Sequence, residues 1–376
     1  MDVCGASLTS IDHCHSLFAV NDSSGGGKQR VVSNMLGKDQ PKIVGFLLIP
    51  DFGLLSYASA IEPLRAANVL SGRQLYRWRH LSPDGGPVAA SNGVYITPDA
   101  ELQHASAELD ALFVLAGGPR ISFDDVATFN YLRRFSRLGR PIAGIGGGPY
   151  VLARAGVLNG YRFTLHREYA PALREEFPEL DVRRTLYEVD RNRLTSSGGT
   201  TSLDMMHTFI SRDHGPELAA TVSDWFMQTD NRAASQPQRM PLSQRIGVQN
   251  QATLRAVACM EANIEVPLSR AEIAAEVGIS ARQLERLFVS HLGCTPGRYY
   301  LQVRLQRARI LLRQSGLSIT QVAIACGFGS TNHFSRAYRQ KLGLPPAQER
   351  TSRIRMDVSS RRKDVAFSHT GAYPDQ

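Results

Sequence analysis

The chain has 376 residues, 43% hydrophobic and 20% charged, which is enough for two or three domains with cores of their own. It contains no run of 18 or more apolar residues, so the sequence predicts no membrane-spanning helix. The N-terminus lacks a signal-peptide pattern. Five cysteines without a Cys-x-x-Cys pair exclude a disulfide framework and a spaced zinc site. We therefore expect a cytoplasmic protein that uses no metal and no cofactor.

The formal net charge of +9 is concentrated in the last third of the chain. Residues 246–376 carry 18 basic and 9 acidic residues, whereas residues 1–245 carry 25 of each. A basic end on an otherwise neutral protein is typical of proteins that bind nucleic acid. A solvated face with a basic tail would give the same balance, so charge alone leaves both interpretations open.

In chain order, residues 1–40 are rich in Ser, Gly, Asp and Asn, which predicts a disordered leader. Residues 41–229 then alternate between strand-like and helix-like segments. The expected strands are at 43–49, 76–82, 93–97, 109–116, 142–145 and 193–197. This alternation predicts an α/β domain with a doubly wound, mostly parallel sheet, a flavodoxin-like sandwich.

The sequence after residue 229 changes character. Residues 230–245 hold two prolines and few apolar residues, as expected of a linker. Residues 246–350 are helical in pattern throughout and predict an all-α domain. Residues 351–376 form a basic, polar tail.

The all-α region contains one motif twice, at residues 268–289 and 317–340, with the copies 49–50 residues apart. Each copy begins with a serine suited to cap a helix, reaches a turn glycine (Gly278 or Gly327) and continues into a second helix. This is the outline of a helix-turn-helix, whose second helix fits the major groove of DNA.

A longer amphipathic helix is predicted between the two motifs, starting at Pro296. Four arginines crowd its remaining surface: Arg304, Arg307, Arg309 and Arg313. A rod of this kind would hold two recognition helices about one DNA turn, ~34 Å, apart.

With Gly278, Pro296, Gly327-Phe328, Phe334-Ser335-Arg336 and the closing Leu342-Gly343-x-Pro345-Pro346, this region resembles the AraC/XylS DNA-binding domain. The resemblance implies that outward residues of both recognition helices meet base edges, which suits Arg, Asn and Glu side chains. The residues expected at bases are Arg282, Glu285, Arg286, Thr331, Asn332 and Arg336. Those expected at phosphates are Ser280, Gln283, Ser330 and His333. For any single residue expected at a base, a phosphate contact or a solvated side chain is the alternative.

The α/β region resembles the PfpI-like branch of the class I glutamine amidotransferase superfamily, and the whole chain resembles regulators that fuse this fold to an AraC-type domain. The residues that carry this resemblance are Glu62-Pro63-Leu64-Arg65, Gly117-Gly118, Leu152-Ala153-x-Ala155-Gly156, His166, Ser196 to Thr200, and Asp204. Enzymes of the superfamily place a cysteine at a tight turn after a strand. Here that position is Gly146, so we expect no catalytic residue.

A turn without its nucleophile can still bind a ligand. Backbone N–H groups at Gly147 and Gly148 could hold a carboxylate, Glu62 a cation, and His166 a polar group. We expect the ligand site to comprise Glu62, Gly117, Gly118, Gly146, Gly147, Gly148, His166 and Thr200. Glu62 as a helix cap, His166 as an interior residue, and Gly117-Gly118 as a tight strand-to-loop turn remain alternatives. The resembling regulators respond to betaine- or carnitine-type metabolites, which implies a small carboxylate or zwitterion.

The sequence thus predicts a transcription regulator that binds promoter DNA. The resemblance implies activation through RNA polymerase, control by a small-molecule inducer, and a homodimer. Two alternatives stay open: an amidotransferase- or protease-like enzyme with a DNA-binding appendage, and a ligand-independent DNA binder whose α/β domain only dimerises.

Overall fold

The α/β domain is built on strands whose residues are buried on both faces. The computed structural model describes residues 40–105, 108–118 and 123–350. Strand β6 (Ala111–Ala116) is buried at every position and pairs in parallel with β1 (Lys42–Leu48) and β7 (Ile142–Gly146). Continuous apolar runs of this kind are typical of central strands covered by helices on both sides. The predicted leader, up to residue 39, and the predicted tail lie outside the described residues.

Seven strands form the sheet, in the order β5-β2-β1-β6-β7-β9-β8. The outer strands are β5 (Ala100–Glu101), β2 (Tyr76–Ser82), β9 (Arg193–Ser196) and β8 (Tyr187–Asp190). All neighbours are parallel except β8 and β9. The prediction of a mostly parallel sheet is therefore confirmed. The chain winds outward in one direction from β1 and in the other from β6, and open α/β sheets bind ligands at such a switch point.

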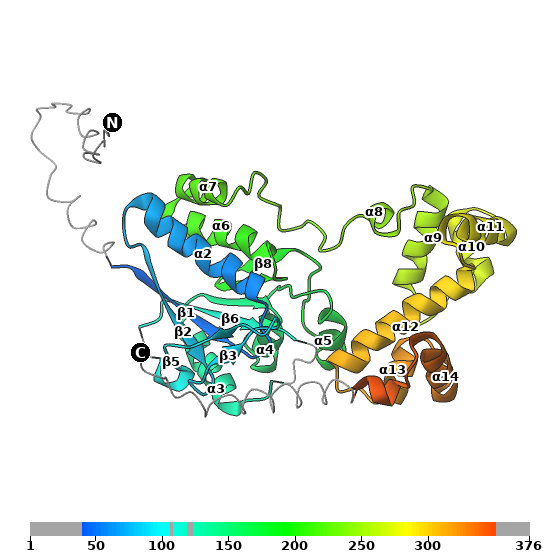
Figure 1. Ribbon diagram of the computed structural model, residues 1–376, viewed down its shortest axis with the longest axis horizontal. Coiled ribbons are helices and arrows are strands. Elements are labelled where there is room, and N and C mark those ends of the chain that lie inside the picture. Colours follow the sequence, from blue (N-terminus) through cyan, green and yellow to red (C-terminus); the bar gives the residue numbers. More distant parts are fainter. Residues whose placement is uncertain (1–39, 106–107, 119–122, 351–376) are drawn as a thin grey trace, which may run out of the picture. The chain divides into compact units, whose positions relative to one another are not determined.

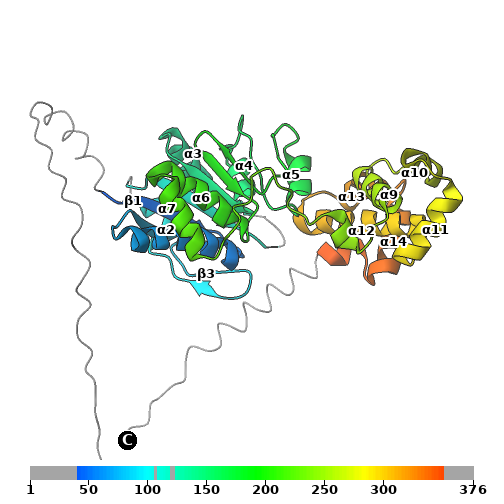
Figure 2. The ribbon, with the colours of Figure 1, turned by 90° about the horizontal axis from the view of Figure 1, so that it is seen from above.

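Helices cover both faces of this sheet (Figures 1 and 2). On one face lie α2 (Leu54–Ser71), α6 (Thr201–His214) and α7 (Pro216–Trp225). On the other lie α3 (Val126–Arg137), α4 (Gly148–Arg154) and α5 (Ala170–Glu176). Each face has its own apolar core, with Phe46, Phe113 and Phe209 in the first and Leu112, Leu132 and Phe163 in the second.

One predicted strand is much shorter than expected. The segment 93–97 contributes only β4 (Tyr95–Ile96), which pairs antiparallel with β3 (Val88–Ala89) in a separate hairpin. A single-turn 3-10 helix, η2 (Leu102–His104), follows β5. The predicted strand was too long because Tyr95 was counted as a core residue, whereas its side chain is exposed.

Residues 242–342 are helical, as the periodicity predicts. The helices are α8 (Leu242–Ile246), α9 (Gln251–Ala262), α10 (Arg270–Val277), α11 (Ala281–Leu292), α12 (Pro296–Gln314), α13 (Ile319–Ala325) and α14 (Thr331–Leu342). Two apolar cores hold them. One joins α9, α10 and α11 around Leu284 and Phe288, and the other joins α12, α13 and α14 around Phe334 and Tyr338.

The local signals of both motifs are present in the structure. Ser269 and Ser318 cap α10 and α13 in reciprocal capping boxes with Glu272 and Gln321. Gly327 has a left-handed φ of 71°, and a Cβ there would lie 2.5 Å from Pro267 Cγ. A side chain at this turn would therefore meet both backbone strain and a clash.

The segment predicted as a linker is bonded to the α/β domain as far as Gln238. Gln238 Nε2 donates to Thr164 Oγ1 at 3.0 Å and to the Thr185 carbonyl oxygen at 2.7 Å. The amide of Leu186 donates to the Ala234 carbonyl oxygen. Its last residues begin α8. The segment is therefore more ordered than its composition indicates.

Candidate nucleic-acid interface and ligand site

Helix α11 presents one polar face to solvent. Leu284 and Phe288 are buried in the core, whereas Arg282 and Arg286 are exposed and Glu285 is half-buried. A shallow hollow runs along this face, and its lining includes Arg270, Arg282, Gln283, Glu285, Arg286, Val289 and Ser290. The three predicted base-reading residues of the first motif therefore share one open surface, as a helix in a major groove requires.

Helix α14 repeats the arrangement with different chemistry. Phe334 and Tyr338 are buried, and Asn332 and Arg336 are exposed. Thr331 is half-buried, and its hydroxyl donates to Thr320 Oγ1 at 3.3 Å. A second hollow on this face is lined by Ser335, Arg336, Arg339, Gln340, Gly343 and Pro345. Arg339 and Gln340, one helical turn beyond Arg336, were missed by the sequence reasoning, although their spacing places them on the same stripe.

The predicted phosphate contacts lie at the two helix starts, where their side chains already have partners. The Ser280 hydroxyl accepts from the Gln283 amide at 3.2 Å, and the Gln283 side-chain oxygen accepts from the Ser280 amide at 3.0 Å. Ser330 caps α14 by accepting from the His333 amide, and the His333 ring packs 5.7 Å from that of Phe328. The side chains of Ser280, Gln283 and Ser330 therefore cap the helices whose N-termini would face phosphates.

Three of the four α12 arginines that the sequence placed on the exposed surface instead bond other parts of the helical region. Arg304 Nε donates to the Cys326 carbonyl oxygen at 2.8 Å, and its guanidinium lies 4.1 Å from the Phe328 ring centroid. Arg309 and Arg313 both bond Glu349, a side chain with 3% exposure. Burial acts to raise the pKa of Glu349, but these two guanidinium groups hold it below its usual range. Arg304 thus fastens α12 to the second motif directly, and Arg309 and Arg313 do so through Glu349, which also accepts from the Tyr338 hydroxyl at 3.1 Å.

In the α/β domain, the turn after β7 has the geometry of a nucleophile elbow but carries no reactive side chain. Gly146 adopts a left-handed φ of 67°. A Cβ at Gly148 would lie 2.0 Å from the Val114 carbonyl oxygen, so only glycine fits. The Gly147 N–H donates to the Ala116 carbonyl oxygen at 2.8 Å. That N–H is therefore used within the fold, which corrects the expectation that it would be open to a ligand carboxylate.

The structure brings His166 and Gly118 to this elbow. The His166 amide donates to the Gly146 carbonyl oxygen at 3.0 Å, and the Tyr169 hydroxyl donates to the Gly118 carbonyl oxygen at 2.8 Å. The rings of His166 and Tyr169 lie 5.7 Å apart. Burial lowers the pKa of His166, so the neutral imidazole is favoured. Gly117 is also at this edge, packed so closely on residue 51 that a Cβ would be 2.3 Å from its carbonyl oxygen.

Ser56, in the first turn of α2, completes this edge and was missed from the sequence. Its hydroxyl accepts from the Gly199 amide at 2.7 Å. A Cβ at Gly198 would lie 2.9 Å from that hydroxyl and 3.0 Å from the Gly146 Cα. The turns after β1, β7 and β9 therefore meet at one place. Its place in the sequence could have indicated this, because Ser56 follows shortly after the carboxyl end of β1, just as Gly146 lies at the carboxyl end of β7.

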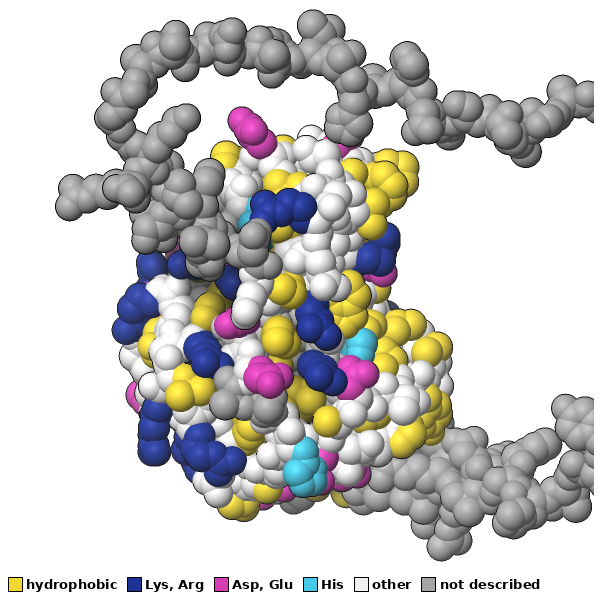
Figure 3. Space-filling model, turned by 90° about the vertical axis from the view of Figure 1, so that its left-hand side faces the viewer, with side chains coloured by type: hydrophobic (Ala, Val, Ile, Leu, Met, Phe, Trp, Pro, Cys, Tyr) yellow, Lys and Arg dark blue, Asp and Glu magenta, His cyan; other side chains and the backbone are white. Residues whose placement is uncertain are grey.

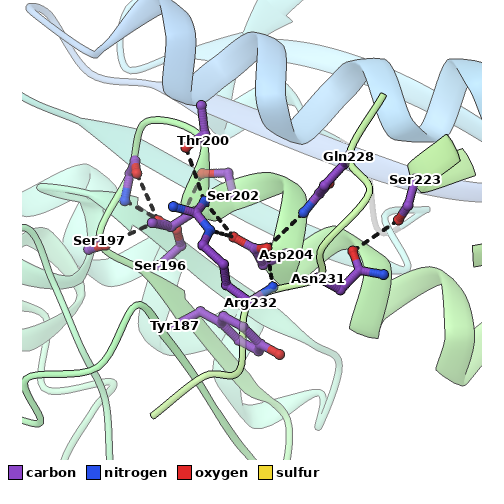
Figure 4. A network of polar contacts seen from close by, with 12 residues as sticks. Tyr187, Ser196, Ser197, Thr200, Ser202, Asp204, Ser223, Gln228, Asn231 and Arg232 are labelled. Carbon is purple, nitrogen blue, oxygen red and sulfur yellow. Dashed lines mark hydrogen bonds and ion pairs between the residues drawn. The ribbon is translucent and has the colours of Figure 1, made fainter. Parts of the chain in front are cut away.

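A buried carboxylate organises the turn after β9 (Figure 4). Asp204 has 1% exposure and accepts from Gln228 Nε2 at 2.7 Å and from the Arg232 side chain at 2.7 Å. The same guanidinium donates to Thr200 Oγ1 at 3.0 Å. Nearby, the hydroxyls of Ser196 and Ser197 both bond the hydroxyl of Thr201. Thr200, a predicted ligand residue, is therefore held by the first residues after the α/β domain.

Glu62, which was expected near the ligand, has another partner, and so has Tyr150 at the start of α4. Glu62 accepts from Arg65 Nε at 2.7 Å on α2, and no hydrogen bond joins it to the elbow in the part of the chain that the structure describes. The Tyr150 hydroxyl donates to Glu176 Oε2 at 2.7 Å in the core below α4. Burial and that carboxylate raise the pKa of Tyr150. The polar groups gathered at the elbow are instead His166, Tyr169 and Ser56.

Among the described residues, neither a cysteine nor a cluster of metal-binding side chains lies at this edge. The described cysteines, Cys259, Cys294 and Cys326, all belong to the helical region. Burial raises the pKa of Cys326 to about 12, which disfavours the thiolate. Among the described residues, no group of three or more His, Cys, Asp or Glu side chains could hold a metal ion. Over the same residues, no helix combines the length and apolar character needed to cross a bilayer.

The face of the α/β domain on the left-hand side of Figure 1 carries no large patch of side chains with one sign of charge. In the space-filling view of Figure 3, Lys and Arg side chains lie among Asp, Glu and apolar side chains. This mixture agrees with the equal numbers of basic and acidic residues in residues 1–245. Positive charge exposed for a polyanion is therefore expected on the helical region.

Comparison with known proteins gives two family matches, a helix-turn-helix domain over residues 273–352 and the DJ-1/PfpI family over residues 52–212. The HTH-type transcriptional regulator GbdR of Pseudomonas aeruginosa is 46% identical over 313 residues, which cover 82% of this chain and 84% of GbdR. CdhR of the same species is 44% identical over 81% of this chain and 90% of its own. GlxA of Rhizobium meliloti is 43% identical over 82% of this chain and 95% of its own. These similarities extend beyond either domain alone, and the chain belongs to the family of HTH-type transcriptional regulators that join a DJ-1/PfpI domain to an AraC-type DNA-binding domain.

Proposed function

We propose that this regulator activates transcription when a small carboxylate or zwitterionic metabolite binds its α/β domain. The observation that carries the proposal is the pairing of two exposed reading faces, on α11 and α14, with an elbow that keeps its geometry and lacks a nucleophile. The first feature suits DNA recognition, and the second suits binding without turnover.

On DNA, α11 and α14 would each enter the major groove. Arg282, Arg286 and Arg336 have the fork that pairs bidentately with guanine, Asn332 can pair with adenine, and Glu285 can accept from cytosine. Thr331 lies at the start of α14, where its methyl group can meet a thymine. The capped N-termini of both helices would contact phosphates through backbone N–H groups.

In the α/β domain, the ligand would bind where the turns after β1, β6, β7 and β9 meet. Neutral His166, the Ser56 hydroxyl and the Tyr169 ring line this edge, and Gly117, Gly118 and Gly146 allow close approach of the ligand. A zwitterion fits this chemistry, because its carboxylate can accept from hydroxyl and imidazole donors while its cation lies on an aromatic face.

Control requires that the ligand bind two arrangements of the protein with different affinity. We infer that the α/β domain forms a homodimer, that the dimer occupies repeated half-sites, and that activation proceeds through RNA polymerase in the cytoplasm. These inferences rest on membership of the regulator family.

The test uses the full chain. Duplexes selected from a random pool should yield one enriched sequence, and purified RNA polymerase should transcribe from it more strongly with the regulator and a metabolite panel present. A panel of betaines, carnitine and amino acids in thermal-shift assays should contain at least one compound that raises the midpoint of the α/β domain, because a ligand that binds only the folded form stabilises it.

Two other functions would give different results. An enzyme would turn over amide or aldehyde substrates, whereas we expect no turnover because the elbow has no side-chain nucleophile. A ligand-independent binder would select a sequence but show no thermal shift with any compound. Absence of an enriched sequence would contradict the proposal itself.

A further inference from the structure

One ion pair crosses from the first helix of the first motif to its recognition helix. Arg270, the first residue of α10, donates from Nη1 to Glu285 Oε2 of α11 at 2.6 Å. Both side chains line the hollow that also contains Arg282 and Arg286. Within the described residues, no hydrogen bond reaches the other carboxylate oxygen, Oε1.

The fold does not need this pair, because the second motif is built without it. Counted from the helix caps, Ile319 of α13 takes the place of Arg270, and Ser335 of α14 takes the place of Glu285. The side chains of Arg270 and Glu285 are 60% and 39% exposed, and exposed ion pairs contribute little to stability. The pair therefore contributes little to the packing of the motif, and its role is at the surface of the hollow.

A lone carboxylate in this hollow would face the phosphates of a bound duplex. Its charge would be repelled, and its rotamer would be unfixed, so it would read a base poorly. Arg270 removes both problems, since it offsets the charge and fixes one carboxylate oxygen. The second oxygen is then left to accept from the amino group of a cytosine, the one donor that this base offers in the major groove.

We infer that Arg270, which lies outside the recognition helix, is a positioning residue for Glu285, and that the pair reads one C·G base pair. This inference rests on the proposed major-groove binding of α11. It assigns to Arg270 an effect on the choice of base, whereas an arginine at the start of a helix would otherwise be expected to contact phosphate.

The experiment compares full-length Arg270→Gln, Glu285→Gln and the double variant with the native chain on a duplex selected from a random pool. Glu285→Gln should lower the preference for cytosine at one position by roughly 5- to 100-fold. Arg270→Gln should lower it at the same position, and the double variant should equal Glu285→Gln, because residues that act as a pair are not additive. Arg270→Lys, which keeps the charge, should retain part of the preference.

Arg255→Gln is the matched control, since Arg255 is an exposed arginine of α9 that bonds the Glu276 carbonyl oxygen and does not line the hollow. It should leave every base preference unchanged. The inference is overturned if Arg270→Gln weakens all sequences equally, with the slope of log K against log salt reduced by about 0.9, as expected for a lost phosphate contact. It is overturned also if Arg270→Gln changes nothing. If the native chain selects no sequence, the proposed function fails instead.

Discussion

The polar side chains at the strand ends of the α/β domain bond one another, whereas the reading arginines on the faces of α11 and α14 point into solvent. Asp204 is buried beneath Arg232 and Gln228. Within the described residues, Arg282 and Arg336 make no hydrogen bond or ion pair. A site for a small molecule must be fixed before the ligand arrives, because few contacts are available to organise it. A surface that binds a polyanion makes its contacts when the polymer arrives, so its hydrogen-bond donors can stay solvated in the free protein.

Salt should affect these two regions very differently, and this is the largest effect that we expect. Raising the salt concentration from about 50 to about 200 mM should weaken binding to a selected duplex about 10³-fold if six phosphates are contacted. The stability of the α/β domain should hardly change. Tryptophan fluorescence can follow that domain alone, because both tryptophans, Trp78 and Trp225, lie in it. A flat salt response of binding would contradict the reading of α11 and α14 as duplex-binding helices.

Removing the buried carboxylate should destabilise the α/β domain strongly. Asp204→Ala leaves the Arg232 guanidinium without its partner, and breaking a buried pair in this way costs about 3–5 kcal/mol. Because Arg232 is one-third exposed, we expect the lower end of that range. Urea unfolding followed by tryptophan fluorescence measures the loss. Asp181→Ala is the control, since its pair with Arg183 is exposed and should contribute less than about 1 kcal/mol. Equal losses of unfolding free energy in the two variants would show that the buried pair at Asp204 is no more important than an exposed one.

Removing one reading arginine should weaken DNA binding without changing stability. Arg286→Ala and Arg336→Ala should each weaken binding to the selected duplex by ~1–3 kcal/mol and relax the choice of base at one position. Their unfolding midpoints should equal that of the native chain, because neither side chain has a partner among the described residues. Unchanged footprints and base preferences in both variants would show that these faces do not read sequence.

Acid should destabilise the α/β domain through His166, and this is the smallest effect. Burial holds the pKa of His166 below its ordinary value of about 6.5, so the unfolded chain takes up a proton before the folded chain does. The stability contributed by the neutral ring is therefore complete above about pH 6.5 and is lost as the pH falls below it. Fluorescence-detected urea midpoints should fall between about pH 7.5 and pH 5.5. They should fall less in His166→Gln, and an identical pH profile would exclude this origin.

The sequence predicted the features that depend on neighbouring residues. The helix caps at Ser269 and Ser318 and the turn at Gly278 each involve residues only a few positions apart, so their signals are local. The buried strands were recognisable for the same reason, because a continuous apolar run is visible without knowing its neighbours.

Contacts between distant residues could not be predicted. Ser56 reaches Gly199 across 143 positions, and the pairing of Arg309 and Arg313 with Glu349 turns exposed-looking charges into internal ties. The resemblance predicted a ligand-binding role for Glu62, but its carboxylate forms an ion pair with Arg65, three residues away. Types of residue indicate possible chemistry, but the partner that each side chain meets depends on the fold.

The bonds made by Gln228, Arg232 and Gln238 have a consequence for building chimaeric regulators. A fusion that joins a foreign DNA-binding domain at Asp230 would remove Arg232, and with it the main cationic partner of Asp204. A junction placed after Gln238 would keep every one of these ties within the donor of the α/β domain. The natural place to exchange such modules is therefore close to Arg239, several residues beyond the end of the last helix of the sheet domain.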